Sequence, residues 1–123
     1  MSYIDGFLIP VPKAQLDDYL RIARKSGEMW MEHGALHYVE GVADDVKHGK
    51  WTDFYRAVDA KEDETVIFSF VVYASREARD ALMTELMPKL EAMFDKNNMP
   101  FDGKRMIFGG FRGAVEFPAR GAA

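Results

Sequence analysis

The chain has 123 residues, with 16 basic and 20 acidic side chains and a formal net charge of −4. This length fits one domain with a real core, and the acidic balance argues against nucleic acid or an anionic membrane as a partner. The sequence contains no cysteine, which excludes disulfides, thiolate catalysis and cysteine-based metal sites. It also lacks a signal-peptide pattern and any apolar run near the roughly 20 residues of a membrane helix, so we expect a cytoplasmic protein.

The first residues predict a strand followed by a helix. Residues 3–11 are densely apolar but are interrupted by Asp5 and Gly6. This interruption predicts a strand with a bulge or a close backbone approach at the glycine. Pro12 suits the first position of a helix, and the apolar spacing that follows predicts one over residues 13–33.

Gly34 ends this helix, and two more strands are predicted after it. The first covers residues 35–43, with Glu40 near the strand end or the solvent. A polar segment with a turn signal follows, and residues 51–58 are then predicted to form a further strand.

The strand at residues 65–73 is the one around which the prediction is organised, because all but one of its residues are β-branched or aromatic. The strand period places Val66, Phe68, Phe70 and Val72 on one face and Ile67, Ser69, Val71 and Tyr73 on the other. Both faces are apolar, so this strand must be covered on both sides.

The remaining chain predicts a second helix and a last strand. Ser75 is a good N-cap, and the helix that it begins is expected to break or kink at Pro88. Residues 105–111 form the last strand, in which Gly109 and Gly110 indicate a close backbone approach or a bulge.

The order of strand, helix, two or three strands, helix and strand predicts an α+β fold. It is the ferredoxin-like split βαβ arrangement, an antiparallel sheet with two helices on one face. We expect a single domain over residues 1–117 and a flexible tail at residues 118–123. The helices leave the other sheet face bare, and an identical copy is the simplest source of a covering sheet. The sequence therefore predicts a homodimer, with either the Phe68 face or the Val71 face of the central strand at the interface.

Four stretches carry a resemblance to a known family. They are Tyr3 to Phe7, Gly34 to Glu40, Thr52 to Val58 and, above all, the run from Met99 to Phe111. On these stretches the chain resembles the small bacterial YbaA-like proteins, a family of unknown function, over nearly everything before Arg112. The resemblance implies a dimeric α+β barrel in which two ferredoxin-like sheets face each other. Relatives of that wider fold include monooxygenases, isomerases, haem enzymes and stress-response modules, so the fold does not select a function.

Asp5 is the main candidate for a catalytic residue. It lies within an apolar strand, where a buried carboxyl group can accept or deliver a proton. The alternative is an Asp-Gly bulge whose carboxylate caps backbone N–H groups. The sequence leaves both interpretations open.

Four further side chains are candidates for binding a small molecule, namely Tyr38, Trp51, Arg56 and Arg105. Aromatic walls with one cationic anchor are the usual composition of such a site. Core packing and dimer burial explain the aromatic residues equally well, and a structural salt bridge is the alternative for Arg105.

No metal or cofactor is predicted. His33, His37 and Glu40 have suitable ligand types, but the glycine between the histidines separates them into different elements. His37 and Glu40 point to opposite faces of one strand, and His33 is assigned to the helix C-terminus. Motifs for dinucleotides, phosphate loops and nucleophile elbows are absent from the sequence.

Two functions are consistent with this pattern. The first is a homodimer that binds a small molecule, with a cofactor-independent enzyme as one form of it. The second is a non-catalytic interaction or stress-response module, in which the aromatic residues serve packing and dimerisation.

Overall fold

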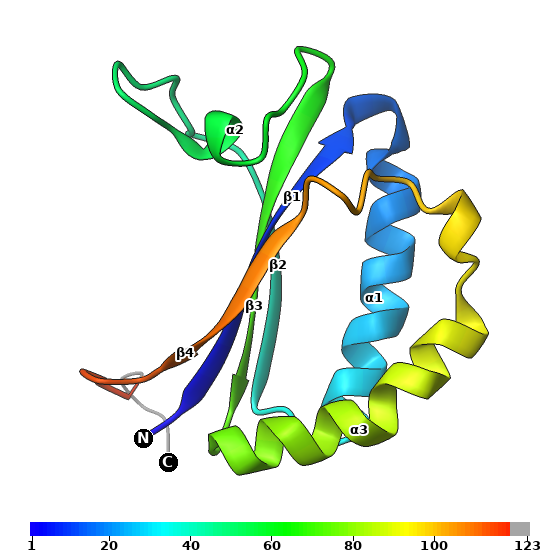
Figure 1. Cartoon of the computed structure of the whole chain (residues 1–123), viewed down its shortest axis with the longest axis vertical. Coiled ribbons are helices and arrows are strands. Elements are labelled where there is room, and N and C mark those ends of the chain that lie inside the picture. Colours follow the sequence, from blue (N-terminus) through cyan, green and yellow to red (C-terminus); the bar gives the residue numbers. More distant parts are fainter. Residues whose placement is uncertain (119–123) are drawn as a thin grey trace.

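The computed structural model describes residues 1–118, and Figure 1 shows a twisted sheet with two long helices along one face. The strands are β1 (Tyr3–Pro12), β2 (His37–Val42), β3 (Glu64–Tyr73) and β4 (Ile107–Arg112). The helices are α1 (Leu16–Glu32), α2 (Phe54–Ala57) and α3 (Arg76–Met93), with short 3-10 turns η1 (Lys13–Gln15) and η2 (Lys96–Asn98). The strand order is β2-β3-β1-β4, and all neighbours are antiparallel. This confirms the predicted α+β class and its ferredoxin-like arrangement.

The strand predicted at residues 51–58 is wrong, because the short helix α2 lies there instead. Asp53 is its N-cap and accepts hydrogen bonds from the backbone N–H of Arg56 at 2.8 Å and of Gly49 at 2.9 Å. These local side-chain-to-backbone bonds compete with strand pairing and prevail here.

The bulge predicted near Asp5 and Gly6 is also absent, since β1 pairs residue for residue with β3 and β4. In β4, Gly110 marks a close approach of side chains to the backbone rather than a bulge. A side chain at Gly110 would overlap the hydroxyl of Tyr3 and lie 2.9 Å from the guanidinium of Arg79. The bare glycine therefore leaves room for these two side chains over the sheet.

Helix α3 begins as predicted and is one helix on both sides of Pro88. The side chain of Ser75 caps it by accepting a hydrogen bond from the backbone N–H of Ala78 at 3.0 Å. The helix runs past Pro88 and ends at Met93, so the proline does not end it.

The core lies between the sheet and the two long helices. Ile67, Val71 and Tyr73 of β3 face the helices and are at most 1% exposed. Two apolar clusters fill this layer, one around Val71 and α3 and the other around Ile67 and α1. The structure thus decides which face of the central strand is internal.

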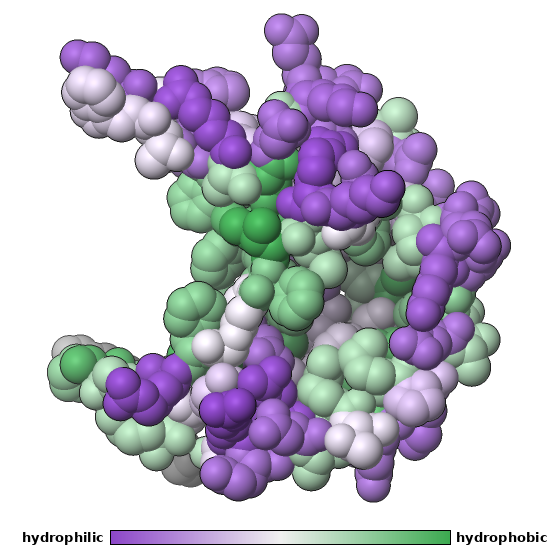
Figure 2. Space-filling view, in the orientation of Figure 1, coloured by the Kyte–Doolittle hydropathy of each residue, from purple (hydrophilic) through white to green (hydrophobic). Residues whose placement is uncertain are grey.

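The helices leave the other sheet face bare; within the described residues only its end at Val66, which is 3% exposed, is covered, and there the ring of Phe54 packs against Phe68. We call it the open sheet face; the register aligns on it His37, Val39 and Gly41 of β2, Val66, Phe68, Phe70 and Val72 of β3, Ile4, Gly6 and Leu8 of β1, and Ile107, Gly109 and Phe111 of β4. Phe68, at its centre, is 50% exposed, and Phe111 is 63% exposed. Figure 2 shows hydrophobic side chains gathered in the hollow on this side of the molecule.

Residues 43–63 connect β2 to β3 and include α2; we call this segment the arm. Figure 1 shows it projecting sideways near one end of the sheet, on the side away from α1 and α3. The tail expected at residues 118–123 falls almost entirely on residues 119–123, which lie outside the described part. Within residues 1–118, the helices are too short or too polar to span a bilayer.

Candidate functional site

Asp5 lies in the middle of a polar cluster between the sheet and α3. It is 5% exposed and pairs with Val71 of β3 and Gly110 of β4. Its Oδ2 accepts a hydrogen bond from the hydroxyl of Tyr73 at 2.9 Å, and that hydroxyl accepts one from Nε1 of Trp30 at 3.0 Å. A chain of hydrogen bonds therefore runs from α1 through β3 to the carboxylate, and the partners of Asp5 are side chains rather than backbone N–H groups.

Arg79 of α3 supplies the positive charge of this cluster. One terminal nitrogen lies 3.5 Å from Oδ1 of Asp5, and the other donates a hydrogen bond to the hydroxyl of Tyr3 at 3.1 Å. The guanidinium also lies 4.9 Å from the centre of the Tyr3 ring, a cation–π distance.

The guanidinium of Arg79 is incompletely satisfied. Its Nε lies 3.1 Å from a carboxylate oxygen of Asp80, but without hydrogen-bond geometry. Among the described residues, this Nε is the sole fully buried side-chain nitrogen or oxygen without a hydrogen-bond partner. Such a group in a native fold calls for an explanation.

The electrostatics keep the hydroxyl of Tyr73 protonated. Burial raises the pKa of Tyr73, and the negative charge of Asp5 raises it further against the opposing hydrogen bond from Trp30. Burial lowers the pKa of Arg79, but the charge of Asp5 and the contact with Tyr3 outweigh it and raise the pKa overall. Tyr73 is therefore a hydrogen-bond donor to Asp5, and Arg79 is a permanent cation beside it.

A second acidic cluster surrounds Glu40, which was expected near a strand end or the solvent. The structure places Glu40 half-buried on the helix-facing side of β2, opposite Ser69 of β3. Its carboxylate accepts hydrogen bonds from the hydroxyls of Tyr19, at 2.7 Å, and Tyr38. Burial and the charge of Glu40 raise the pKa of both tyrosines, so both stay protonated donors. The strand period places Glu40 on the same face as Tyr38, so the sequence could have indicated that contact. It could not have indicated Tyr19, which lies on α1, far from Glu40 in the sequence.

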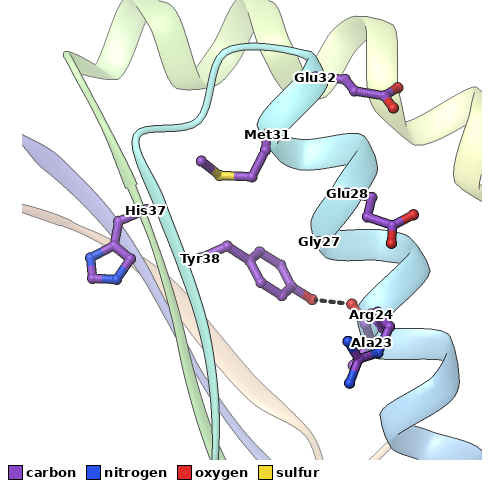
Figure 3. A pocket seen from close by; sticks show the side chains of 8 residues that line it. All are labelled: Ala23, Arg24, Gly27, Glu28, Met31, Glu32, His37 and Tyr38. Carbon is purple, nitrogen blue, oxygen red and sulfur yellow. Dashed lines mark hydrogen bonds between the residues drawn. The ribbon is translucent and has the colours of Figure 1, made fainter.

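Beside this cluster lies a groove between α1 and the edge strand β2, with a volume of about 510 Å³. We call it the α1–β2 groove; it is lined by Ala23, Arg24, Gly27, Glu28, Met31, Glu32, His37 and Tyr38 (Figure 3). The ring of Tyr38 lies against Gly27, where an added Cβ would be 2.8 Å from it. The hydroxyl of Tyr38 reaches the carbonyl of Ala23 at 3.2 Å, whereas Figure 3 shows His37 on the far side of β2.

The four predicted binding residues are not brought together. Tyr38 lines the α1–β2 groove, whereas Trp51 lies in the arm and is 84% exposed. Arg56 is also in the arm, where its guanidinium lies 3.8 Å from Asp53.

Arg105 forms the structural salt bridge that was the alternative to a binding role. Its two terminal nitrogens lie 2.7 Å from the two carboxylate oxygens of Glu64, which is 5% exposed. It also contacts Asp102 at 3.0 Å and the carbonyl of Asp59 at 2.9 Å. These contacts tie the loop before β4 to the start of β3.

The three residues weighed for metal binding lie apart. His33 is the C-cap of α1, with Nδ1 2.8 Å from the carbonyl of Met29, as assigned. His37 is on the open sheet face and Glu40 on the other. No group of three potential ligands suited to a metal ion occurs within residues 1–118.

The fold and the cluster around Asp5 define an α+β protein with a four-stranded antiparallel sheet and a buried acid between its layers. Comparison with known proteins places it more narrowly. Residues 2–103 match the model of a family described as "Protein of unknown function (DUF1428)". The chain is 45% identical, over 116 residues, to the uncharacterized protein YbaA of Escherichia coli K12, covering 94% of this chain and 99% of that protein; the Shigella flexneri protein of the same name matches equally. The chain belongs to this family of unknown function.

A comparison of folds finds a de novo designed protein, Foldit4, with a TM-score of 0.48 and 10% identity. The match covers 91% of this chain and 98% of the designed one. It adds nothing to the question of function.

Proposed function

We propose that this protein is a homodimer that binds a polar small molecule at the cluster of Asp5, Arg79 and Tyr3. One observation supports the binding site: a buried carboxylate lies beside a cation that is incompletely hydrogen-bonded. Asp5 is 5% exposed, and Nε of Arg79 has no hydrogen-bond partner. A ligand with both a hydrogen-bond acceptor and a donor would complete the cluster.

The geometry also supports proton transfer as the chemistry of such a site. Asp5 is oriented by a neutral donor, Tyr73, and lies beside a cation, Arg79. A cation beside a carboxylate stabilises negative charge that develops on a bound substrate. An enzyme of this kind would need no cofactor, because the acid–base group and the charge are both supplied by the chain.

The dimer rests on the open sheet face. Aromatic and aliphatic side chains from all four strands lie on it, and contiguous apolar surface on a small protein marks an interaction site. A second copy presents the same apolar surface, so two sheets can pack face to face about a two-fold axis. Sedimentation equilibrium at low micromolar concentration should therefore give twice the chain mass of 14.0 kDa, and a folded, monodisperse species of 14.0 kDa would refute the dimer.

The binding site is tested by a thermal-shift screen of metabolites on the wild-type protein and on Asp5→Asn. A ligand should raise the melting temperature of the wild type by several degrees and leave that of Asp5→Asn unchanged. The substitution itself should cost about 1 kcal/mol of unfolding free energy, because the amide still accepts from Tyr73 but loses its charge beside Arg79.

Asp45→Asn is the matched control, because Asp45 is exposed in the arm and should keep the full ligand response. A ligand that stabilises Asp5→Asn as well as the wild type would place binding elsewhere. A broad screen without any ligand would favour the alternative, a non-catalytic interaction module.

A further inference from the structure

The arm is held in a fixed shape by its own contacts. The rings of His48 and Tyr55 stack at 4.4 Å, and the hydroxyl of Tyr55 donates to the carbonyl of Val46 at 2.9 Å. The carboxylate of Asp53 joins the helix α2 to the backbone of Gly49. A segment fixed in this way loses little conformational entropy when it binds a partner.

The arm presents a large aromatic side chain to the solvent. Trp51 is 84% exposed, and Nζ of Lys50 lies 5.1 Å from the centre of its ring. Tryptophan on a rigid support is the residue type that most often anchors a protein interface. Together, Trp51 and Lys50 form an apolar plate with a positive charge beside it.

The α1–β2 groove has the complementary character. Its floor is formed by Gly27, Met31 and the ring of Tyr38, and its rim carries Arg24 at one end and Glu28 and Glu32 further along α1. These two acids lie one helical turn apart on α1, so their charges repel each other unless a cation is near. Neither forms an ion pair within 4.0 Å in the described part of the chain. An apolar floor beside two unpaired acids fits an aromatic residue next to a lysine, with the lysine at the Glu28 and Glu32 end of the rim.

The two surfaces cannot meet within one copy. The arm leaves β2 after Val42, whereas the groove is lined by His37 and Tyr38 at the start of the same strand. The six residues of β2 separate them by roughly 20 Å at 3.3 Å per residue. A two-fold axis across the strands brings the end of one β2 beside the start of the other. Figure 1 shows the arm on the open-face side, where a second copy would pack.

We propose that the arm of each copy docks on its partner, with Trp51 in the partner's α1–β2 groove and Lys50 between Glu28 and Glu32 on its rim. The contact is self-complementary, so it forms twice in one dimer. The inference rests on the homodimer proposed above and adds a second, separate contact to the packing of the open sheet faces.

Sedimentation equilibrium of matched variants tests the docking. Trp51→Ala should raise the dissociation constant of the dimer by about tenfold or more, because a central aromatic anchor is lost. The double variant Glu28→Lys with Glu32→Lys should weaken the dimer similarly, and adding Lys50→Glu to it should restore most of the affinity. Glu85→Lys, an exposed change on α3, is the charge-matched control and should leave the dimer unchanged.

Fluorine NMR on the protein labelled with 5-fluorotryptophan gives an independent reading, because the chain has two tryptophans. Trp30 is buried in the core, so both resonances should be protected from a soluble quencher in the dimer, and the Trp51 signal should become accessible on dilution to monomer. A wild-type dimer with an accessible Trp51 and unchanged affinity in Trp51→Ala would overturn the docking while leaving the homodimer intact. A wild-type monomer would overturn both.

Discussion

Replacing Phe68 with aspartate is expected to convert the proposed dimer into a folded monomer. Phe68 is 50% exposed in the single chain, so the new carboxylate can stay hydrated when the chain is alone. In the dimer, the same carboxylate would be buried against the partner's apolar face without a counter-charge, at a cost of several kcal/mol. Sedimentation equilibrium should give the mass of one chain, and far-ultraviolet circular dichroism should keep the wild-type helix and strand signal.

The control for this experiment is Val71→Asp, only three residues away on the same strand. Val71 is 1% exposed and faces the helices, so its carboxylate would be buried within the core itself. This variant should unfold rather than dissociate. Unfolding of both variants, or a Phe68→Asp variant that remains dimeric at low micromolar concentration, would contradict the assignment of the open sheet face as the interface.

Arg105→Ala should lower the free energy of unfolding by about 3 kcal/mol. The change leaves the carboxylate of Glu64 buried without its bidentate partner, and removing one member of a buried ion pair is strongly destabilising. The side chain of Arg105 is 18% exposed, so we expect a loss of stability at the lower end of the range for breaking a buried ion pair. Urea denaturation at pH 7 measures the loss. Arg21→Ala, which breaks an exposed pair with Asp18, is the control and should change stability by less than about 1 kcal/mol.

The same pair sets a dependence on pH. Hydrogen bonds from Arg105 lower the pKa of Glu64 against the opposing effect of burial. A carboxyl group whose folded pKa is depressed stabilises the fold above its unfolded pKa of about 4.3 and loses that contribution as pH falls through the folded value. The gap in stability between wild type and Arg105→Ala should therefore be full at pH 7 and shrink below about pH 4. A gap that stays constant from pH 7 to pH 3 would show that Glu64 is not the residue Arg105 stabilises.

The candidate site was predictable in part. Asp5 stood out because an acid within an apolar strand must be paired or functional. Its partners did not, because Tyr73, Arg79 and Trp30 lie far from it in sequence and no periodic pattern links them. Trp51 and Arg56 are grouped with Tyr38 on composition, yet the structure places them in the arm, whereas Tyr38 lines the α1–β2 groove.

The sequence by itself determined the order of the four strands and the two long helices, the sheet class and the apolar character of both faces of β3, because strand and helix periods and apolar content are local properties. The tertiary structure alone decided which face is internal. Ile67 and Val71 face the helices because β1 and β2 align Asp5 and Glu40 with that side, where Tyr73, Tyr19 and Tyr38 can hydrogen-bond them. The two faces of β3 have nearly equal hydrophobicity, so the sequence alone does not show which one is internal. The internal face is the one on which the buried carboxylates meet hydrogen-bond partners that are distant in sequence.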